Sequence, residues 1–439
     1  MNWKWICRRF LVFLPLTGLF VPTVRPQQMS SFDRDRALLM LEDVAKDVQK
    51  HYYDQDFHGV DWDATVLEAK RKIKAETSLN LALAHIAAAL VSLNDSHTFF
   101  LPPPRPYVHD YGFQMDMIGS QCYVIRVRPG SDAETKGLKP GDEVLTLNGY
   151  QPERATLWKM EYRYNVLRPE PGLRLVLRDV QGQQRQVDVM AKFKQLPRVR
   201  DVTGEHIWDM IREGETEQHL MRARWVAVGD DLWVLKFPSF RFDQSEVESM
   251  IDRARKRPAL ILDLRGNPGG AVDTLKVMLG GMFENEVKVG DRVGRKESRP
   301  EVAKSRGHNV FTGKLVVLVD SRSASAAELF AHIVQLDKRG VVVGDHSSGS
   351  VMEAKRYSYK IGQDSVVFFG ASITEADLVM SDGKSLEHTG VTPDELVLPT
   401  AADLASGRDP ALSRAAALLG VKIAPEDAGK MFPYEWPTE

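Results

Sequence analysis

The sequence predicts a multidomain α/β protein, and three features of its 439 residues support that prediction. The length allows two to four domains of roughly 100–200 residues each. Apolar residues in the 31–100 region recur at helical spacing, whereas short strand-like runs follow between 107 and 195. From about 196 to 405 strands and amphipathic helices alternate, which is typical of a layered α/β fold.

Composition and charge exclude several classes of protein. Hydrophobic residues make up 43% and charged residues 27% of the chain, which excludes a wholly disordered or collagen-like protein. The 58 Lys and Arg residues against 60 Asp and Glu residues leave a formal net charge of −2, and no basic stripe with interleaved aromatic residues is present. We therefore expect no nucleic-acid partner. The two cysteines, Cys7 and Cys122, exclude a disulfide scaffold.

Residues 1–28 have the pattern of an export leader or signal anchor. Lys4, Arg8 and Arg9 precede an apolar run from Phe10 to Val24, which proline and glycine interrupt. That run is short for a bilayer-spanning helix of about 20 residues. We expect an exported protein, periplasmic or extracellular. No good cleavage site follows the run, so both a cleaved leader and an uncleaved membrane anchor remain open. A buried amino-terminal helix is the alternative.

The 29–100 region is predicted to be a helical N-terminal domain. Apolar spacing predicts helices around Leu38–Val48, Trp62–Ile73 and Leu79–Leu93. The third helix is expected to end at the polar turn Asn94-Asp95-Ser96-His97-Thr98. The proline-rich run Leu101–Pro106 cannot continue a helix and marks a domain boundary.

The 101–195 region is predicted to be a small β-rich domain. Strands are expected at Tyr123–Val127 and Glu143–Leu147, and the run Ser131–Asp142 between them resembles the signature of a PDZ domain. A PDZ domain adds an extended peptide to a sheet edge and holds its terminal carboxylate in backbone amides. The alternative is a β-rich spacer without a ligand. The resemblance implies that the peptide-binding loop consists of Tyr111, Gly112, Phe113 and Gln114.

The 196–405 region carries the alternating strands and helices, and 406–439 is predicted to be a C-terminal helix and tail. The expected elements are strands at Leu232–Leu235, Ala259–Leu264, Leu315–Val319 and Gly340–Gly344, and helices at Gln244–Lys256, Val272–Met282 and Arg408–Leu419. A further helix follows the run Ser321–Glu328 and ends at Leu336.

Two of these strand–turn–helix connections could hold a reaction centre. A serine at the start of a helix, Ser323 or Ser325, has an unpaired amide and the positive end of a helix dipole beside it. Both favour a nucleophile whose attack creates an oxyanion. The glycine-rich loop Arg265–Gly270 follows another buried strand at the edge where ligands gather in α/β folds. The alternative is that either serine is only a helix cap.

Three motifs together resemble the carboxyl-terminal processing (tail-specific) serine peptidases. They are Asp263-Leu-Arg-Gly-Asn-Pro-Gly-Gly270, Ser323-Ala-Ser-Ala-Ala-Glu328 and Val341-Val-Val-Gly344. The resemblance implies a crotonase-like α/β peptidase core over 196–405. Site residues carried over from the family are Ser325 as nucleophile, with the amides of Ala326 and of Gly269 or Gly270 as the oxyanion hole.

One departure from the family pattern concerns the catalytic base. Better-known members use a lysine about 25 residues after the serine, where this chain has Ser348-Gly349-Ser350-Val351. The tricorn-like branch uses a Ser-His pair from the amino-terminal region and a late glutamate instead. Similarity to that branch implies His97 as the base, oriented by Glu387 with or without Ser96 between them.

Other bases remain open. His346 follows the next strand and is the main rival, His388 is a weaker one, and Lys355 would serve only if the loop were displaced. His332 lies seven residues after Ser325 on the same helix, about 10 Å along its axis, and is too far away. Neither a metal-ligating pattern nor a nucleotide loop is present in the sequence, so we expect no metal and no cofactor.

The resulting expectation is an exported serine endopeptidase that hydrolyses unfolded or C-terminal polypeptide segments through an acyl-enzyme. The PDZ domain would capture or gate the polypeptide substrate. The alternative is a catalytically inactive peptidase fold that binds peptides or apolar ligands. A crotonase-like hydratase shares elements of the fold but predicts neither a PDZ domain nor an export leader.

Overall fold

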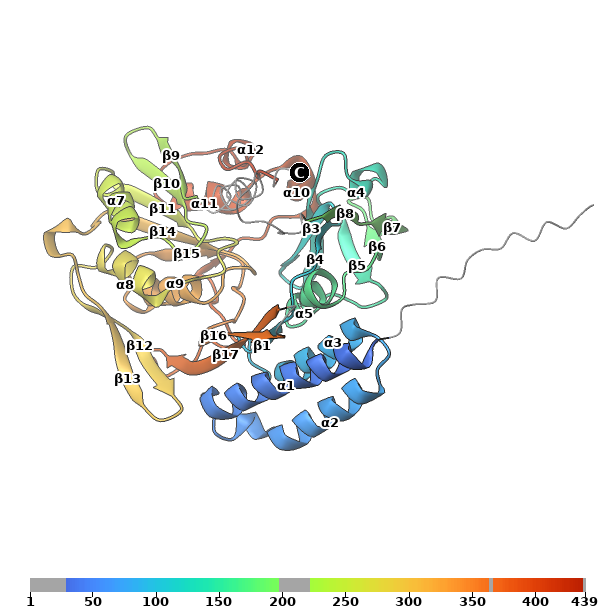
Figure 1. Ribbon diagram of the computed structural model, residues 1–439. Coiled ribbons are helices and arrows are strands. Elements are labelled where there is room, and N and C mark those ends of the chain that lie inside the picture. Colours follow the sequence, from blue (N-terminus) through green and yellow to red (C-terminus); the bar gives the residue numbers. More distant parts are fainter. Residues whose placement is uncertain (1–28, 197–221, 363–365, 437–439) are drawn as a thin grey trace, which may run out of the picture.

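The computed structural model of the chain describes residues 29–196, 222–362 and 366–436. Figure 1 shows a helical layer, a small β-rich domain and a larger α/β core that meet in the middle of the molecule. The leader predicted over 1–28 lies outside the described residues. Among the described helices, none has the length and apolar character that crossing a bilayer requires.

The N-terminal layer consists of α1 (Ser31–His51), the 3₁₀ turn η1 (Phe57–Gly59), α2 (Trp62–Ala75) and α3 (Leu79–Val91). The buried residues of α1 include Leu41, Val44 and Val48, which share one face at helical spacing. These residues belong to a hydrophobic cluster that also contains Ala371 and Ile373 of the α/β core. The predicted helical region is therefore packed directly against the α/β core, and the polar turn at 94–98 faces that junction.

A short strand carries the chain from the helical layer into the core. Strand β1 (Phe99–Leu101) pairs antiparallel with β17 (Val367–Val379), with Phe100 opposite Ala371. Because the turn 94–98 directly precedes β1, this pairing fixes the turn at the edge of the core.

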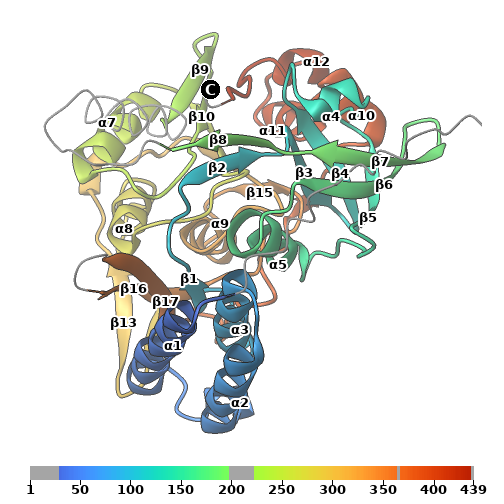
Figure 2. The same ribbon diagram turned by 45° about the vertical axis from the view of Figure 1, so that its right-hand side comes forward.

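The 107–195 region is mostly β-structure, as predicted. Its elements are β2 (Tyr107–Asp110), β3 (Phe113–Ile118), β4 (Gln121–Val127), α4 (Asp132–Thr135), β5 (Glu143–Leu147), α5 (Leu157–Glu161), the π-helical turn η2 (Tyr162–Leu167), β6 (Gly172–Arg178), β7 (Gln184–Met190) and β8 (Lys192–Gln195). The sheet order is β3-β4-β5-β6-β7, so β3 is an edge strand, and a separate ribbon joins β2 to β8. Figure 2 shows α5 on the side that faces the core.

The central core sheet has the order β18-β15-β14-β11-β10-β9. Its elements in the chain are β9 (Arg224–Val228), β10 (Leu232–Lys236), α7 (Gln244–Ala254), β11 (Ala259–Asp263), α8 (Val272–Gly280), β14 (Lys314–Val319), α9 (Ala326–Leu336), β15 (Val341–Gly344) and β18 (Glu395–Leu396). Alternate residues of β11 face opposite sides, with Leu260 and Leu262 against α7–α9 and Ile261 against the C-terminal helices. Loops after the parallel strands therefore meet at one edge.

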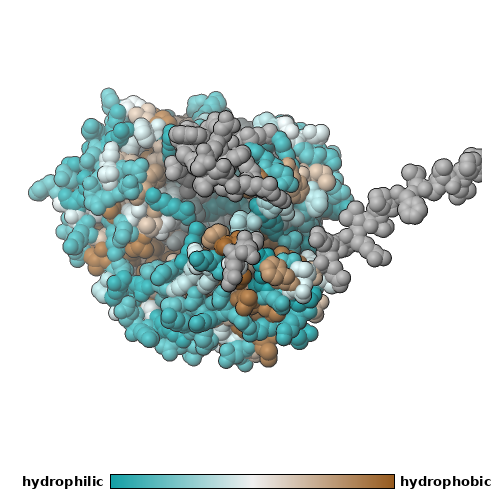
Figure 3. Space-filling view, in the orientation of Figure 1, coloured by the Kyte–Doolittle hydropathy of each residue, from teal (hydrophilic) through white to brown (hydrophobic). Residues whose placement is uncertain are grey.

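A second sheet was not predicted from the sequence. It is built from β12 (Val287–Gly294), β13 (Ser298–Ala303), β16 (Met352–Ile361) and β17, with β1 at its edge, and η3 (Gly307–Asn309) follows β13. These are long antiparallel strands with many polar residues, so they lack the apolar runs by which parallel strands are recognised. Figure 3 shows a mainly hydrophilic face with hydrophobic residues gathered around the β16–β17 hairpin, where Phe368 is 62% exposed.

The predicted C-terminal helix Arg408–Leu419 is present as α11 (Pro410–Leu418), and two short helices that were not predicted, α10 (Ala401–Ser406) and α12 (Pro425–Ala428), lie on either side of it in the sequence. Gly407 adopts a left-handed conformation (φ 66°) and ends α10, and Pro410 opens α11. Helices predicted to reach Leu93 and Met282 end two residues earlier, at Val91 and Gly280.

Candidate active site

Ser325 lies on a strained turn between β14 and α9. It is the N-cap of α9, with φ 55° and ψ −119°, a conformation that costs energy for any residue with a Cβ atom. Its amide donates to the carbonyl of Ser350 (2.8 Å) and to the Glu328 carboxylate (2.9 Å). A serine held this way at the end of a parallel strand, at a helix N-terminus, has the setting of a nucleophile.

The glycine loop after β11 lies against this turn. A Cβ atom on Gly269 would come within 2.6 Å of the Ser325 Cβ and 3.0 Å of the Ala326 amide nitrogen, so only glycine fits there. The Gly269 amide already donates to the Asn267 side-chain oxygen (2.8 Å). Within the described residues, the amides of Ala326 and Gly270 have no hydrogen-bond partner. Of the two glycines predicted for the oxyanion hole, Gly270 is thus the one with a free amide.

His97 is held by the turn that follows α3. The Asp95 side chain, which is 3% exposed, accepts hydrogen bonds from the amides of His97 (2.8 Å) and Thr98 (2.7 Å). It also accepts from the hydroxyls of Tyr52 (2.8 Å) and Thr374 (2.7 Å). The conformation of the turn is therefore fixed from both the helical layer and the second sheet.

A hydrogen-bonded chain joins His97 to Glu387 through Ser96. The Ser96 hydroxyl lies 2.7 Å from His97 Nδ1 and donates to Glu387 Oε2 at 2.9 Å, while the Ser96 amide donates to Glu387 Oε1 at 2.7 Å. A hydroxyl has one hydrogen, so Ser96 accepts from His97 Nδ1–H when it donates to the carboxylate. His97 Nε2 is then left as an acceptor, which is the tautomer that a general base requires.

The loop at 347–351 connects this chain to the serine turn. Glu387 Oε2 accepts from the Val351 amide (2.8 Å), and the neighbouring Ser350 accepts from the Ser325 amide through its carbonyl. The Glu328 carboxylate accepts from Ser350 and Gly349 amides at 2.9 and 2.7 Å. One loop therefore binds both the Ser325 turn and the carboxylate that holds Ser96 and His97.

Burial sets the ionisation of these groups. It lowers the pKa of His97 below its usual 6.5, partly offset by the Asp95 carboxylate, so that the imidazole is neutral near pH 7. Burial raises the pKa of Glu387 and raises the pKa of Glu328 to about 7, although hydrogen bonds from the 347–351 loop and from Ser325 favour the charged form of Glu328.

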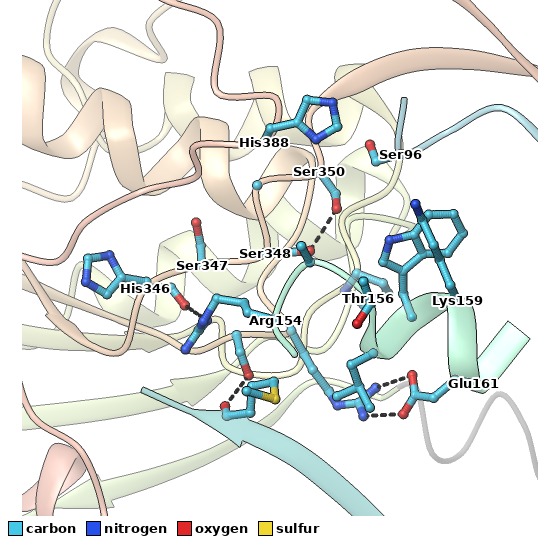
Figure 4. Close-up of a pocket in the computed structure, with 18 of the residues that line it drawn as sticks. Ser96, Arg154, Thr156, Lys159, Glu161, His346, Ser347, Ser348, Ser350 and His388 are labelled. Atoms are coloured by element: carbon cyan, nitrogen blue, oxygen red, sulfur yellow. Dashed lines mark hydrogen bonds and ion pairs between the residues drawn. The ribbon is translucent and has the colours of Figure 1, made fainter. Parts of the chain in front are cut away.

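A cavity of about 650 Å³ opens beside these groups, between the β-rich domain and the core. Figure 4 shows Ser96 and Ser350 on its upper side, with Lys159 of α5 and Thr156, the N-cap of α5, below them. Loops on both sides of Ser325 also line it. The cavity is large enough for several residues of an extended peptide.

Ion pairs fasten the β-rich domain at this cavity. Arg322, three residues before Ser325, pairs with Asp116 (3.1 Å) and Glu161 (2.6 Å) of that domain. Arg154 pairs with Asp345 (2.7 Å) and donates to the His346 carbonyl (2.9 Å). The domain therefore contacts the same turns that carry Ser325 and the 347–351 loop.

The rival bases have other partners. His346 Nδ1 lies 3.2 Å from the Thr392 hydroxyl, and Figure 4 shows its ring across the cavity from Ser96. His388 Nε2 binds the Asn94 carbonyl (2.8 Å). His332 lies 3.4 Å from Asp382. Lys355 is exposed on β16, with its ammonium group 5.5 Å from the Tyr357 ring.

The four residues of the predicted peptide-binding loop differ in their surroundings. The Tyr111 hydroxyl donates to the Glu170 carbonyl (2.9 Å), and the Gly112 amide donates to the Asp110 carboxylate (2.7 Å). Phe113 packs against the domain core. Gln114 projects outward, where its side-chain amide donates to the Tyr434 hydroxyl (2.7 Å).

Sequence reasoning did not single out Asp95, Asn267, Glu328 or Arg322 as site residues. Glu328 had a local signal, because a glutamate three residues after a helix-capping serine forms a capping box. The others act through contacts between distant segments, which no local pattern shows. Among the described residues, no group of three or more His, Cys, Asp or Glu side chains is arranged to hold a metal ion.

Comparison with known families identifies the core. A profile of peptidase family S41 matches residues 231–397. Over these residues the chain is similar to peptidase family S41. This S41 region contains Ser325, Glu387 and the glycine loop, whereas Ser96 and His97 lie upstream of it. The resemblance to the carboxyl-terminal processing peptidases is thereby confirmed.

Three relatives illustrate the range of similarity. The tail-specific protease of Haemophilus influenzae is 24% identical over 322 residues, covering 68% of this chain and 43% of that protein. The carboxy-terminal processing protease CtpA of Bacillus subtilis is 24% identical over 287 residues, covering 64% of this chain and 54% of that protein. The carboxyl-terminal-processing protease of Synechocystis is 22% identical over 438 residues, covering 95% of both. The chain thus spans about half the length of the first two.

A solved structure shows the same fold. Mature CPAF, in complex with lactacystin, superposes with a TM-score of 0.62 at 16% identity, covering 85% of this chain and 96% of that one. At this identity the similarity concerns the fold, which extends beyond the S41 region to most of the chain.

Proposed function

We propose that this chain is a serine endopeptidase that cleaves unfolded or C-terminal polypeptide segments with a Ser325–His97–Ser96–Glu387 constellation. The observation that carries the proposal is the Ser96 bridge, because it sets His97 in the tautomer that accepts a proton at Nε2. The names of the three relatives, which are tail-specific and carboxyl-terminal processing proteases, support the choice of a polypeptide substrate.

The proposed reaction has two steps. Ser325 Oγ attacks the peptide carbonyl carbon while His97 Nε2 accepts the hydroxyl proton, and the Glu387 charge stabilises the imidazolium through Ser96. His97 then returns the proton to the leaving amine as the C–N bond breaks, which leaves an acyl-enzyme on Ser325. A water molecule, deprotonated by His97, hydrolyses the ester and restores the hydroxyl.

The oxyanion of each tetrahedral intermediate would be held by the amides of Ala326 and Gly270. Both amides lack a partner in the described residues, and the first belongs to the N-terminal turn of α9, where the helix dipole adds to the stabilisation. Loss of one such donor costs roughly 100- to 1000-fold in kcat.

Substrate capture is assigned to the 101–195 domain, in the manner of a PDZ domain. Its sheet ends in the edge strand β3, to which an extended peptide can add, and the cavity opens between this domain and the core. The leader-like residues 1–28 support an exported, periplasmic or extracellular location for this activity.

The experiment that tests the proposal measures hydrolysis of an unfolded protein and of a fluorogenic peptide by the full chain. We expect Ser325→Ala to abolish both activities while its circular dichroism and unfolding midpoint stay unchanged. Ser92→Ala, an exposed serine at the end of α3, is the matched control and retains full activity. Equal turnover by Ser325→Ala would reject the nucleophile, and absence of turnover in the unmodified chain would favour a peptide-binding role.

A further inference from the structure

The last described residues of the chain lie on the β-rich domain. The Tyr434 hydroxyl accepts a hydrogen bond from the Gln114 side chain (2.7 Å), and the Arg126 guanidinium lies 4.3 Å from the centre of the Tyr434 ring. The Arg128 guanidinium lies 4.7 Å from the Trp436 ring. The two aromatic rings meet edge to face at 5.1 Å. A segment that follows the C-terminal helices of the core is thus held by three side chains of another domain.

The surface under this tail is fixed by its own contacts. Gln114 on β3 is opposite Arg126 on β4, and its side-chain oxygen accepts from Arg126 Nη1 at 2.8 Å. Arg128 is two residues beyond Arg126, on the same face of the sheet, and lies 2.7 Å from the Asp110 carboxylate. The same carboxylate accepts from the Gly112 amide (2.7 Å). The guanidinium groups are therefore oriented by the domain itself.

The base of the tail is anchored to the core. Arg224 on β9 donates to the Pro433 carbonyl (2.6 Å), and its guanidinium lies 5.7 Å from the Phe432 ring. Phe432 packs on the core cluster beneath α11. Tyr434 directly follows Pro433, and Trp436 is three positions after it. So short a tether gives the two rings a high effective concentration at the β-rich domain.

We propose that Gln114, Arg126 and Arg128 form a binding surface for C-terminal polypeptide segments with aromatic residues at alternate positions, and that residues 433–436 are its resident occupant. Guanidinium groups bind aromatic faces, and alternate residues of an extended chain point the same way. Gln114 belongs to the loop predicted to bind peptide. The proposal deepens the proposed function and rests on it. A substrate whose C-terminal segment carries alternate aromatic residues must displace residues 433–436 before it binds.

Peptide binding to the full chain tests the proposal. We would measure fluorescence anisotropy of a labelled peptide with the sequence of residues 433–439, in the Ser325→Ala background so that nothing is cleaved. The wild-type tail should block the surface. Tyr434→Ala/Trp436→Ala should therefore bind the peptide saturably below about 1 mM and at least about tenfold more tightly than the chain with an intact tail.

Matched variants separate this surface from other sites. In the open-tail chain, Arg126→Ala and Arg128→Ala should each weaken peptide binding roughly 3- to 5-fold, as loss of one cation–π contact predicts. Arg253→Ala, which removes a similar contact with Trp225 on the core (4.7 Å), should leave binding unchanged. Tyr434→Phe, which keeps the ring and loses only the hydroxyl, should block the surface nearly as well as the wild-type tail.

Three outcomes would overturn the proposal. They are equal binding to open and intact tails, unchanged binding after Arg126→Ala, and equal binding of a peptide in which both aromatic residues are alanine. Because the assay requires no turnover, failure here leaves the peptidase proposal standing, and loss of peptidase activity elsewhere leaves this one standing.

Discussion

The Ser96 hydroxyl lies 2.9 Å from the Glu387 carboxylate, although 291 positions separate the two residues in the sequence. This contact joins the helical N-terminal layer to the last loop of the S41 region. The Ser96 hydroxyl orients His97 through Nδ1 of the ring. Glu387 also accepts a hydrogen bond from the Val351 amide, which lies beside the Ser325 turn. The position of the base thus depends on two segments, of which only one lies within 231–397.

The Ser96 bridge should be worth a measurable part of the rate. Ser96→Ala removes the hydroxyl between imidazole and carboxylate, and a hydrogen bond to a charged group contributes about 1.5–3 kcal/mol. We expect kcat/KM for a fluorogenic peptide to fall roughly 10- to 150-fold with little change in KM. Ser92→Ala is the control. A full rate in Ser96→Ala would show that Glu387 does not act through this residue.

Activity should depend on pH through His97. Burial lowers the pKa of this imidazole, so protonation, which removes the base, occurs only below its usual value of 6.5. We therefore expect kcat/KM to be constant from about pH 7 upward through pH 8 and to fall on the acid side with a midpoint below 6.5. An acid limb with its midpoint above pH 7 would contradict this assignment.

Gly269 should be intolerant of any side chain. Its φ is +86°, and a Cβ atom would lie 2.6 Å from the Ser325 Cβ. Gly266 in the same loop has a similar φ of +70° but open space around it. Both alanine variants carry the same kind of backbone strain, yet only Gly269→Ala should displace the serine. We expect loss of at least about 100-fold in kcat for Gly269→Ala and near-normal kcat for Gly266→Ala, measured with the same peptide.

Glu328 should make stability depend on pH. Its pKa is raised to about 7 in the folded chain from 4.5, so the folded state binds the proton more tightly than the unfolded state. The free energy of unfolding should therefore fall as pH rises from about 4.5 to 7, by up to about 3 kcal/mol. Urea unfolding of Glu328→Gln should lack this fall, whereas the exposed Glu286→Gln should keep it. A fall that persists in Glu328→Gln would place its origin elsewhere.

Arg322 should couple the β-rich domain to the serine turn. Arg322→Ala leaves Asp116, whose pKa burial raises to about 6 even beside the guanidinium, without its partner. The Asp116 carboxylate is 10% exposed but Arg322 is 38% exposed, so solvent screening reduces the cost of losing this partner below the roughly 3–5 kcal/mol of a fully buried pair. We still expect a lower unfolding midpoint and slower peptide hydrolysis. Arg174→Ala, which breaks an exposed pair with Asp188 inside the domain, should change neither. If Arg322→Ala keeps the wild-type unfolding midpoint and rate of hydrolysis, the β-rich domain does not stabilise the Ser325 turn.

Much of the fold could be predicted because local chemistry determines it. The buried strand at 259–263 and the helix beginning at Ala326 follow from an apolar run and a capping serine. The second sheet was missed, because its strands lack the apolar runs of the parallel strands, although the alternation of polar and apolar residues along β16 is typical of an antiparallel strand. The break between α10 and α11 was also missed, although Gly407 and Pro410 are local signals of it.

The candidate site could likewise be predicted only in part. Ser325, His97, Ser96 and Glu387 were named from motifs, and the structure brings Ser96, His97 and Glu387 into direct contact. Which glycine amide is free could not be predicted, because it depends on Asn267 folding back on Gly269. The hydrogen bonds that Asp95 accepts from Tyr52 and Thr374 could not be predicted either, because these residues are far away in the sequence.

The measurement that most directly tests the account is the rate at which a fluorophosphonate probe labels the full chain near pH 7.5. An activated serine reacts with this probe, so labelling reports the base without a known substrate. We expect His97→Ala to abolish labelling as completely as Ser325→Ala, and His346→Ala to label at the wild-type rate. Wild-type labelling of His97→Ala, or its loss in His346→Ala, would contradict the account.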